Sequence, residues 1–190
     1  MDVEVLVRLA TADPWSFTVL DSLRRRFGLA GLIDVARLKS WELSFISGGV
    51  DQAVSLTERL LRDTALLANP NRDVWFARSD TTEGVPASIW KRSRHVSEAF
   101  AVKVSDLDDI TGRSVTEVIR SRLGIPAIGS VRFSTIWVLE MEGGGTGGLE
   151  TARQVAVASM RGRGLLANPH CQYAEVHQAR AYLEGGGNGR

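Results

Sequence analysis

The sequence is poor in the residues that build disulfides, metal sites and strong electrostatic fields. Its only cysteine is Cys171, which excludes an internal disulfide and an all-cysteine metal site and fits a reducing compartment. Lysine and arginine number 23 against 22 acidic residues, so the net charge of +1 selects neither nucleic acid nor an anionic membrane. No run approaches the ~18 apolar residues of a membrane span. The N-terminal stretch has no basic leader before an apolar core, so we expect a cytoplasmic protein.

An internal duplication organises the chain. The stretch LLANP occurs at residues 66–70 and again at 165–169, each time after a helix-like pattern and before a strand-like one. Each half has the same predicted order, which is strand, helix, long strand, helix and closing strand. In the first helix, Asp13 and Pro14 form the start signal, and Gly28 marks the end. The apolar stripe of this helix runs from Phe17 to Phe27, and that of its counterpart in the second half runs from Val115 to Leu123. Gly28 is equivalent to Gly124, and Trp41 is equivalent to Trp137.

The two LLANP stretches are interpreted as helix stops. The leucine pair would supply the last apolar turn of a helix, and the proline excludes the α conformation for the asparagine before it. The residues with this structural role are Asn69, Pro70, Asn168 and Pro169.

The sequence predicts an α+β fold of two tandem β-α-β-α-β units, with antiparallel sheets and helices on one face, packed as an intramolecular pseudo-dimer. The first unit covers residues 1–79 and the second 98–183, with a linker at 80–97 and a flexible glycine-rich tail at 184–190. Trp90 is expected to dock part of the linker on a domain. Helices on one face leave the other face of each sheet bare, so we expect the two bare faces to cover each other. The aromatics expected between the units are Trp41, Trp137 and Phe133.

Two patterns could carry chemistry but favour ordinary structure. The glycine-rich run at 143–148 precedes a helix, yet it lacks the lysine and hydroxyl that a P-loop needs. Cys171, Glu175 and His177 share a face of the closing strand, but no further ligand is evident. No nucleophile, base and acid set is visible. No catalytic residue, metal or cofactor is therefore expected.

Taken together, the duplicated pattern resembles PurS, the small subunit of the multi-subunit phosphoribosylformylglycinamidine (FGAM) synthase of purine biosynthesis. The family pattern has an Asp-Pro-x-Gly-Arg helix entry, a strand of the form Asp-Val-Arg-x-Gly-Lys-x-x-Glu-Leu, and a second helix ending in LLANP. The matching positions in the first half are Asp13-Pro14, Gly28, Gly31, Asp34-Val35, Lys39, Glu42-Leu43 and residues 66–70. Those in the second half are Gly112-Arg113, Gly124, Val131-Arg132, residues 165–169, Tyr173 and Glu175. The first half lacks the Gly-Arg of the helix entry, and the second has Thr135 in place of Lys39.

The resemblance implies a non-catalytic adaptor that bridges a synthetase-like (PurL-type) subunit and a glutaminase-like (PurQ-type) subunit, in purine biosynthesis or a related specialised pathway. It also implies possible self-association. The basic side chains of the first helix are open to two interpretations, a solvated face or a docking surface for an acidic partner. The candidate partner-interface residues are Arg24, Arg25, Arg37, Lys39, Arg113 and Arg132. The alternative function is a small-ligand regulatory module that binds an effector between two paired α+β units.

Overall fold

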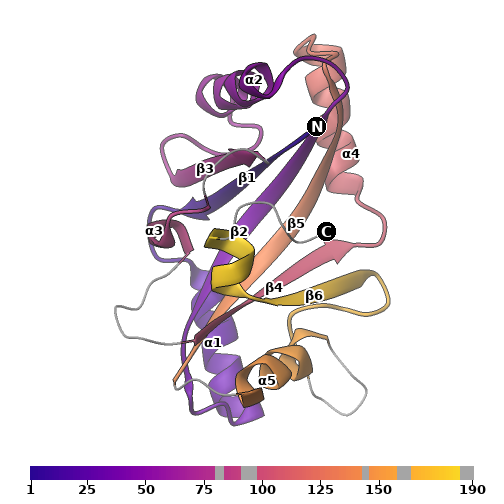
Figure 1. Cartoon of the computed structure of the whole chain (residues 1–190). Helices are drawn as coiled ribbons and strands as arrows, with labels where there is room; N and C mark the ends of the chain where they lie inside the picture. Colours follow the sequence, from indigo (N-terminus) through magenta and orange to yellow (C-terminus); the bar gives the residue numbers. More distant parts are fainter. Residues whose placement is uncertain (80–83, 91–97, 143–145, 158–163, 185–190) are drawn as a thin grey trace.

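The computed structural model describes residues 1–79, 84–90, 98–142, 146–157 and 164–184. Six strands form one antiparallel sheet in the order β3-β1-β2-β5-β4-β6 (Figure 1). The first half contributes three of them, and the second half contributes the other three in mirrored order. Their bounds are β1 (Asp2–Leu9), β2 (Leu32–Phe45), β3 (Asp73–Ser79), β4 (Glu98–Asp106), β5 (Ile128–Met141) and β6 (Gln172–Gln178).

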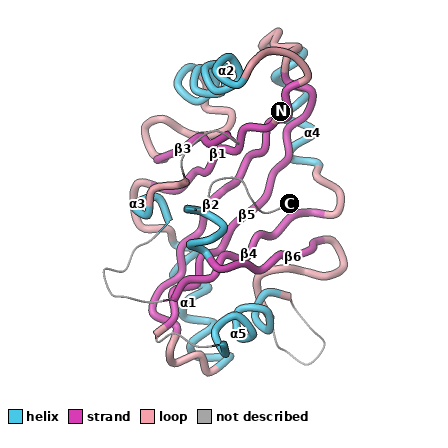
Figure 2. Tube along the Cα trace, in the orientation of Figure 1, coloured by secondary structure: helices cyan, strands magenta, loops and turns pink. Residues whose placement is uncertain are grey.

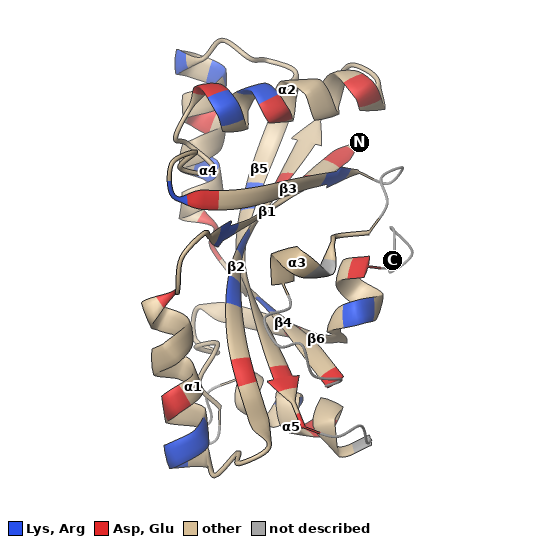
Figure 3. Ribbon diagram, turned by 90° about the vertical axis from the view of Figure 1, so that its left-hand side faces the viewer, with Lys and Arg blue, Asp and Glu red and all other residues tan. Residues whose placement is uncertain are grey.

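Four longer helices cover one face of this sheet, which we call the helix face. Two short segments lie on the opposite face, which we call the cap face (Figure 3). The helices of the helix face are α1 (Pro14–Phe27), α2 (Val50–Asp63), α4 (Ile110–Glu117) and α5 (Thr146–Ala156), with α4 continuing into the π-helical turn η1 (Val118–Arg122). The cap face carries α3 (Ala87–Trp90) and the π-helical turn η2 (Arg180–Glu184). None of the helices within the described ranges is long and apolar enough to cross a membrane.

The two halves meet along the pairing of β2 with β5, which we call the seam (Figure 2). Each of these strands is 14 residues long, and their antiparallel pairing makes one sheet out of two three-stranded halves. The expectation that two separate sheets cover each other face to face is therefore wrong. Edge pairing instead satisfies the backbone groups of two long strands that would otherwise stay unpaired. The α+β class and the antiparallel strands are as predicted.

Helices and strands of different halves share hydrophobic cores on the helix face. Val19 and Leu23 of α1 pack with Phe100, Trp137 and Leu139 of the second half. In the other core, Val115 of α4 and Ile119 of η1 pack with residues of β1, β2 and α2. The third core lies on the cap face. The halves are thus joined by shared cores as well as by backbone hydrogen bonds.

The ends of α1 follow the sequence signals. Asp13 is the N-cap and accepts a hydrogen bond from the backbone N–H of Trp15, with Pro14 at the first helical position. Gly28 ends the helix at φ 69°, a left-handed conformation that glycine adopts without steric cost. Gly124 has φ 63° at the equivalent position, so both halves use the same stop.

The LLANP stretches are turns before a strand and do not end a helix. In the first half α2 stops at Asp63, before the stretch begins. The Asn69 side chain then accepts a hydrogen bond from the N–H of Asn71, and its own N–H donates to Asp73. Asn168 repeats this geometry with His170 and Gln172. The role predicted for Asn69 and Asn168 is thus corrected, because their amides build the turn into β3 and β6.

Several predicted boundaries change in the structure. Trp90 of the predicted linker is only 4% exposed and packs in the cap-face core, as expected. Glu184, assigned to the tail, belongs to η2, a turn that the sequence did not predict. The remaining tail residues 185–190, the linker residues 80–83 and 91–97, and the glycines at 143–145 lie outside the described residues.

Candidate functional site at the seam

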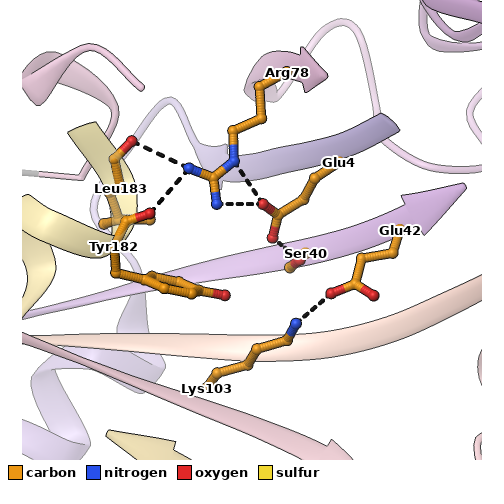
Figure 4. A network of polar contacts seen from close by, with 7 residues as sticks. All are labelled: Glu4, Ser40, Glu42, Arg78, Lys103, Tyr182 and Leu183. Atoms are coloured by element: carbon orange, nitrogen blue, oxygen red, sulfur yellow. Dashed lines mark hydrogen bonds and ion pairs between the residues drawn. The ribbon is translucent and has the colours of Figure 1, made fainter. Parts of the chain in front are cut away.

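A cluster of charged side chains crosses the seam on the cap face (Figure 4). Alternation along the strands puts Glu4 of β1 and Glu42 of β2 on this face, while their neighbours point into the helix-face core. Arg78 comes from β3 and Lys103 from β4, and Tyr182 comes from η2. The cluster therefore combines side chains from both halves of the chain.

Arg78 is the most connected member of this cluster. Its guanidinium pairs with the Glu4 carboxylate at 2.5 and 2.7 Å, and Glu4 also accepts a hydrogen bond from the Ser40 hydroxyl at 2.6 Å. On its other side, Arg78 Nη1 donates to the backbone carbonyls of Tyr182 at 3.0 Å and Leu183 at 3.2 Å. A single planar group thus ties β3 of the first half to η2 of the second.

Lys103 reaches across β5 to form an ion pair with Glu42. Burial opposes the charge on the ammonium, but Tyr182, Glu42 and Glu4 outweigh it and raise the pKa of Lys103 above its ordinary value. The side chain is therefore protonated at neutral pH. A protonated amine is neither a nucleophile nor a base, so this lysine acts as a fixed positive charge between the halves.

Tyr182 lies against the same charges. Burial, followed by the nearby Glu4 carboxylate, raises the pKa of Tyr182 to about 12. Its ring stacks on His177 with the ring centroids 4.6 Å apart, and the Arg78 guanidinium lies 5.6 Å from its centroid. The phenol of Tyr182 therefore stays neutral near pH 7, and its ring helps to hold η2 on the sheet.

The predicted basic residues are not gathered on one surface. Three of them have partners of their own: Arg24 donates to the carbonyls of Leu32 and Ile33, Arg25 pairs with Asp21, and Arg113 pairs with Asp108. Arg132 is exposed on the cap face, beside Glu42 in the register of the seam. Arg37 and Lys39 lie on the opposite face. Of these six residues, Arg132 therefore lies on the cap face, and the other five belong to the helix face or to its helices.

The Arg37 side chain is bound into the helix face. It donates to both carboxylate oxygens of Asp13 at 2.9 and 3.1 Å, and Trp15 and Trp137 each lie 5.8 Å from its guanidinium carbon. Asp13 is 2% exposed, so this is a nearly buried ion pair. Its geometry assigns Arg37 to holding α1 on the sheet.

The large aromatic residues of the long strands meet across the seam. Trp41 and Phe133 face each other in the register, with ring centroids 4.6 Å apart. The Trp41 indole also donates to the carbonyl of Leu67 in the first LLANP stretch at 2.9 Å. Trp137 faces Arg37 at the corresponding position. These contacts lie within one sheet, whereas the sequence suggested contacts between two.

The residues at the C-terminal strand do not form a metal site. His177 Nε2 lies 3.6 Å from the Glu175 carboxylate, and Cys171 is exposed just before β6 begins. No group of three or more possible metal ligands occurs in the part of the chain that the structure describes.

Two exposed apolar corners were not anticipated from the sequence. Trp15 and Phe17, in the first turns of α1, are 63% and 54% exposed. The helix stripe predicted Phe17 to be buried, but it lies on the flank of α1 away from the buried Ser16, Val19 and Leu23. At the start of α4, Leu107 and Ile110 are 64% and 63% exposed. We call these the first corner (Trp15, Phe17) and the second corner (Leu107, Ile110).

The charged cluster could have been found only in part from the sequence. Glu4 alternates with valines in the first strand, which places it on the face opposite to them. The partners of Glu4 and Glu42 depend on the pairing of β2 with β5 and on the position of η2, which local patterns do not encode. No family model matches the chain, and no curated protein is significantly similar to it.

Proposed function

We propose that this chain is a non-catalytic, PurS-like adaptor of a glutamine-dependent FGAM synthase-type complex, in purine biosynthesis or a related specialised pathway. In this role it bridges a synthetase-like subunit and a glutaminase-like subunit. The observation that carries the proposal is that two corners at equivalent places in the two halves expose different apolar side chains. They are Trp15 and Phe17 at one corner and Leu107 and Ile110 at the other.

The argument depends on the symmetry of the sheet. A dimer of identical chains presents two identical corners, which suits two copies of one partner. Here both halves belong to one chain, so each corner has its own side chains while the sheet keeps its mirrored order. Large exposed apolar groups are typical of protein interfaces. Two different corners on a rigid sheet suit two different partners.

The charged cluster supports the adaptor over the small-ligand module. Arg78 and Lys103 are each paired with a carboxylate of the first half, and Arg78 also binds two backbone carbonyls. The Lys103–Glu42 ion pair joins strands of the two halves, and the Arg78 contacts join β3 to η2. A fixed relation is what a bridge between two larger subunits requires.

The proposal is tested by reconstitution with the synthetase-like and glutaminase-like proteins of the same organism. We expect co-purification of the three chains, and loss of glutamine-dependent turnover with retention of ammonia-dependent turnover when this chain is omitted. Full glutamine-dependent turnover without it would contradict the proposal.

The two corners are tested separately in the same assay. The double variant Trp15→Ser/Phe17→Ser should weaken binding to one partner at least tenfold, and Leu107→Ser/Ile110→Ser should weaken binding to the other. Ile46→Ser is the matched control, because Ile46 is 70% exposed but lies at the end of β2, outside both corners. Equal loss of both partners in both double variants would contradict separate corners.

A further inference from the structure

The cap face is closed by two short segments that hold each other. We call them together the cap, which consists of residues 84–90, including α3, and residues 179–184, including η2. The N–H of Val85 donates to the carbonyl of Leu183 at 2.7 Å. The backbone of Gly84 lies so close to Glu184 that an added Cβ atom would be 1.7 Å from the Glu184 carbonyl oxygen. The two segments are therefore packed as one body.

The cap covers an apolar floor at the centre of the sheet. Its own buried side chains are Val85, Ile89, Trp90, Ala179 and Leu183. The floor beneath them consists of small and aliphatic residues from β1, β2, β4 and β5, namely Leu6, Ala36, Leu38, Ala101, Ile136 and Val138. The floor spans the seam, so the cap rests on both halves at once.

The cap contributes no strand to the sheet and has little regular structure of its own. α3 has 4 residues and η2 has 5, and helices of one turn are not stable without tertiary contacts. The two other cores lie on the helix face and contain no cap residue. Separation of the cap from the sheet would thus leave the strand pairing and both helix-face cores intact.

Arg78 is the polar tie between the cap and the sheet. It binds Glu4 on the sheet side and the carbonyls of Tyr182 and Leu183 on the cap side. Tyr182 adds a ring that stacks on His177 of β6 and lies beside the Arg78 guanidinium. The specific contacts between the cap and the sheet are thus those of Arg78 and Tyr182.

From these observations we propose that the cap is a latch, which opens as a unit by local unfolding and uncovers the apolar floor of the seam while the six-stranded sheet stays folded. Such cooperative units of low local stability are where proteins place their moving parts. Arg78 sets how often the latch opens. This inference concerns the chain alone and does not depend on the proposed adaptor role.

Hydrogen exchange of the wild-type chain gives the first measurement. The cap amides, including that of Val85, should exchange at least tenfold faster than buried amides of β2 and β5. Their rate should rise with low concentrations of denaturant, but less steeply than for global unfolding, because the opening exposes the cap and its apolar floor while the sheet stays folded. Exchange of the cap and of the seam strands at one common rate would overturn the proposal.

Gly84→Ala adds one methyl group where the two segments of the cap touch. Because its Cβ would overlap the Glu184 carbonyl, we expect a further tenfold or greater increase in exchange at the cap and a larger acrylamide quenching of Trp90, with unchanged exchange in β2 and β5. Gly31→Ala is the control, since a Cβ there meets no atom within 4 Å. Arg78→Met should also increase hydrogen exchange at the cap, because it removes the polar contacts of the cap with the sheet. No change at the cap in either variant, or an equal increase throughout the sheet, would overturn the latch.

Discussion

The starts of α1 and α4 occupy equivalent places in the two halves but are fixed by different chemistry. Each begins at an aspartate N-cap, Asp13 or Asp109. Asp13 accepts hydrogen bonds from the side chain of Arg37, whereas Asp109 accepts one from the backbone N–H of Phe133 at 2.8 Å. Arg37 and Phe133 are themselves equivalent positions of the two long strands. The same helix position is therefore held by an ion pair in one half and by a backbone hydrogen bond in the other.

This difference teaches how a duplicated unit tolerates divergence. An aspartate at the cap position is retained in both halves, because its carboxylate satisfies N–H groups at the start of the helix. The carboxylate can also accept a hydrogen bond from the neighbouring strand, and either a side chain or a backbone N–H can be the donor. Removing the one partner of a buried charge costs more stability than losing a backbone hydrogen bond, and the following predictions rest on this difference.

Asp13→Ala should have the largest effect. The change removes the helix cap and leaves the Arg37 guanidinium without its carboxylate in a largely buried place, so we expect a loss of about 3 kcal/mol in the free energy of unfolding. Urea denaturation followed by circular dichroism measures this loss. A loss below about 1 kcal/mol would show that the ion pair contributes little beyond the cap.

Asp109→Ala should cost less, about 2 kcal/mol, because it removes a cap and one hydrogen bond without leaving a charge unpaired. The comparison is sharpened by an Arg37→Met background, in which Asp13→Ala should also cost about 2 kcal/mol, as at Asp109. Urea denaturation of the wild type, Asp13→Ala, Arg37→Met and the double variant gives the coupling free energy between Asp13 and Arg37. An unchanged cost of Asp13→Ala in that background would contradict the role assigned to Arg37.

Substitution of the equivalent tryptophans, Trp41 and Trp137, should likewise cost more stability in the first half than in the second. Trp41→Phe removes the donor to the Leu67 carbonyl, and we expect a loss of about 1.5 kcal/mol. Trp137→Phe keeps an aromatic ring beneath Arg37 and should cost about 0.5 kcal/mol. Thermal and urea unfolding of both variants measure the difference. Equal losses would mean that ring size, and not the indole hydrogen bond, decides the cost.

The last effect appears only at alkaline pH and concerns the cap face, where Lys103 stands at the position of Leu6 in the first half. The pKa of Tyr182 is raised from 10.0 to about 12 in the folded chain, so the unfolded chain loses this proton first as the pH rises. The stabilisation is complete below pH 10 and is lost between pH 10 and 12, at about 1 kcal/mol per pH unit. The raised pKa of Lys103 acts in the same direction.

Tyr182→Phe removes one of these two titrations. The alkaline decrease in the free energy of unfolding should therefore be shallower in the variant than in the wild type, with Tyr173→Phe as the control because Tyr173 is 46% exposed. Denaturation at a series of pH values between 9 and 12 measures both slopes. Identical slopes in Tyr182→Phe and the wild type would contradict the raised pKa of Tyr182 in the folded chain.

The sequence predicted the parts of this fold that local chemistry decides. Asp13, Pro14 and Gly28 bound α1 as expected, and alternation located the strands. The LLANP stretch misled because a proline excludes a helix without showing where the helix ended, and α2 had already stopped at Asp63. The pairing of β2 with β5 joins residues about a hundred positions apart, which no local pattern specifies. The charged cluster depends on that pairing, so it could not be assembled from the sequence.

The seam has one position where a strand residue faces its own equivalent, and there Lys39 is paired with Thr135. In a symmetric dimer of identical chains, the residue on such an axis must face a copy of itself. Two lysines directly opposite each other would repel, which destabilises a sheet. A chain that carries both halves is free of this constraint and can keep a cation on the axis beside a neutral hydroxyl. Covalent fusion thus permits a charge at the one point where symmetry would double it.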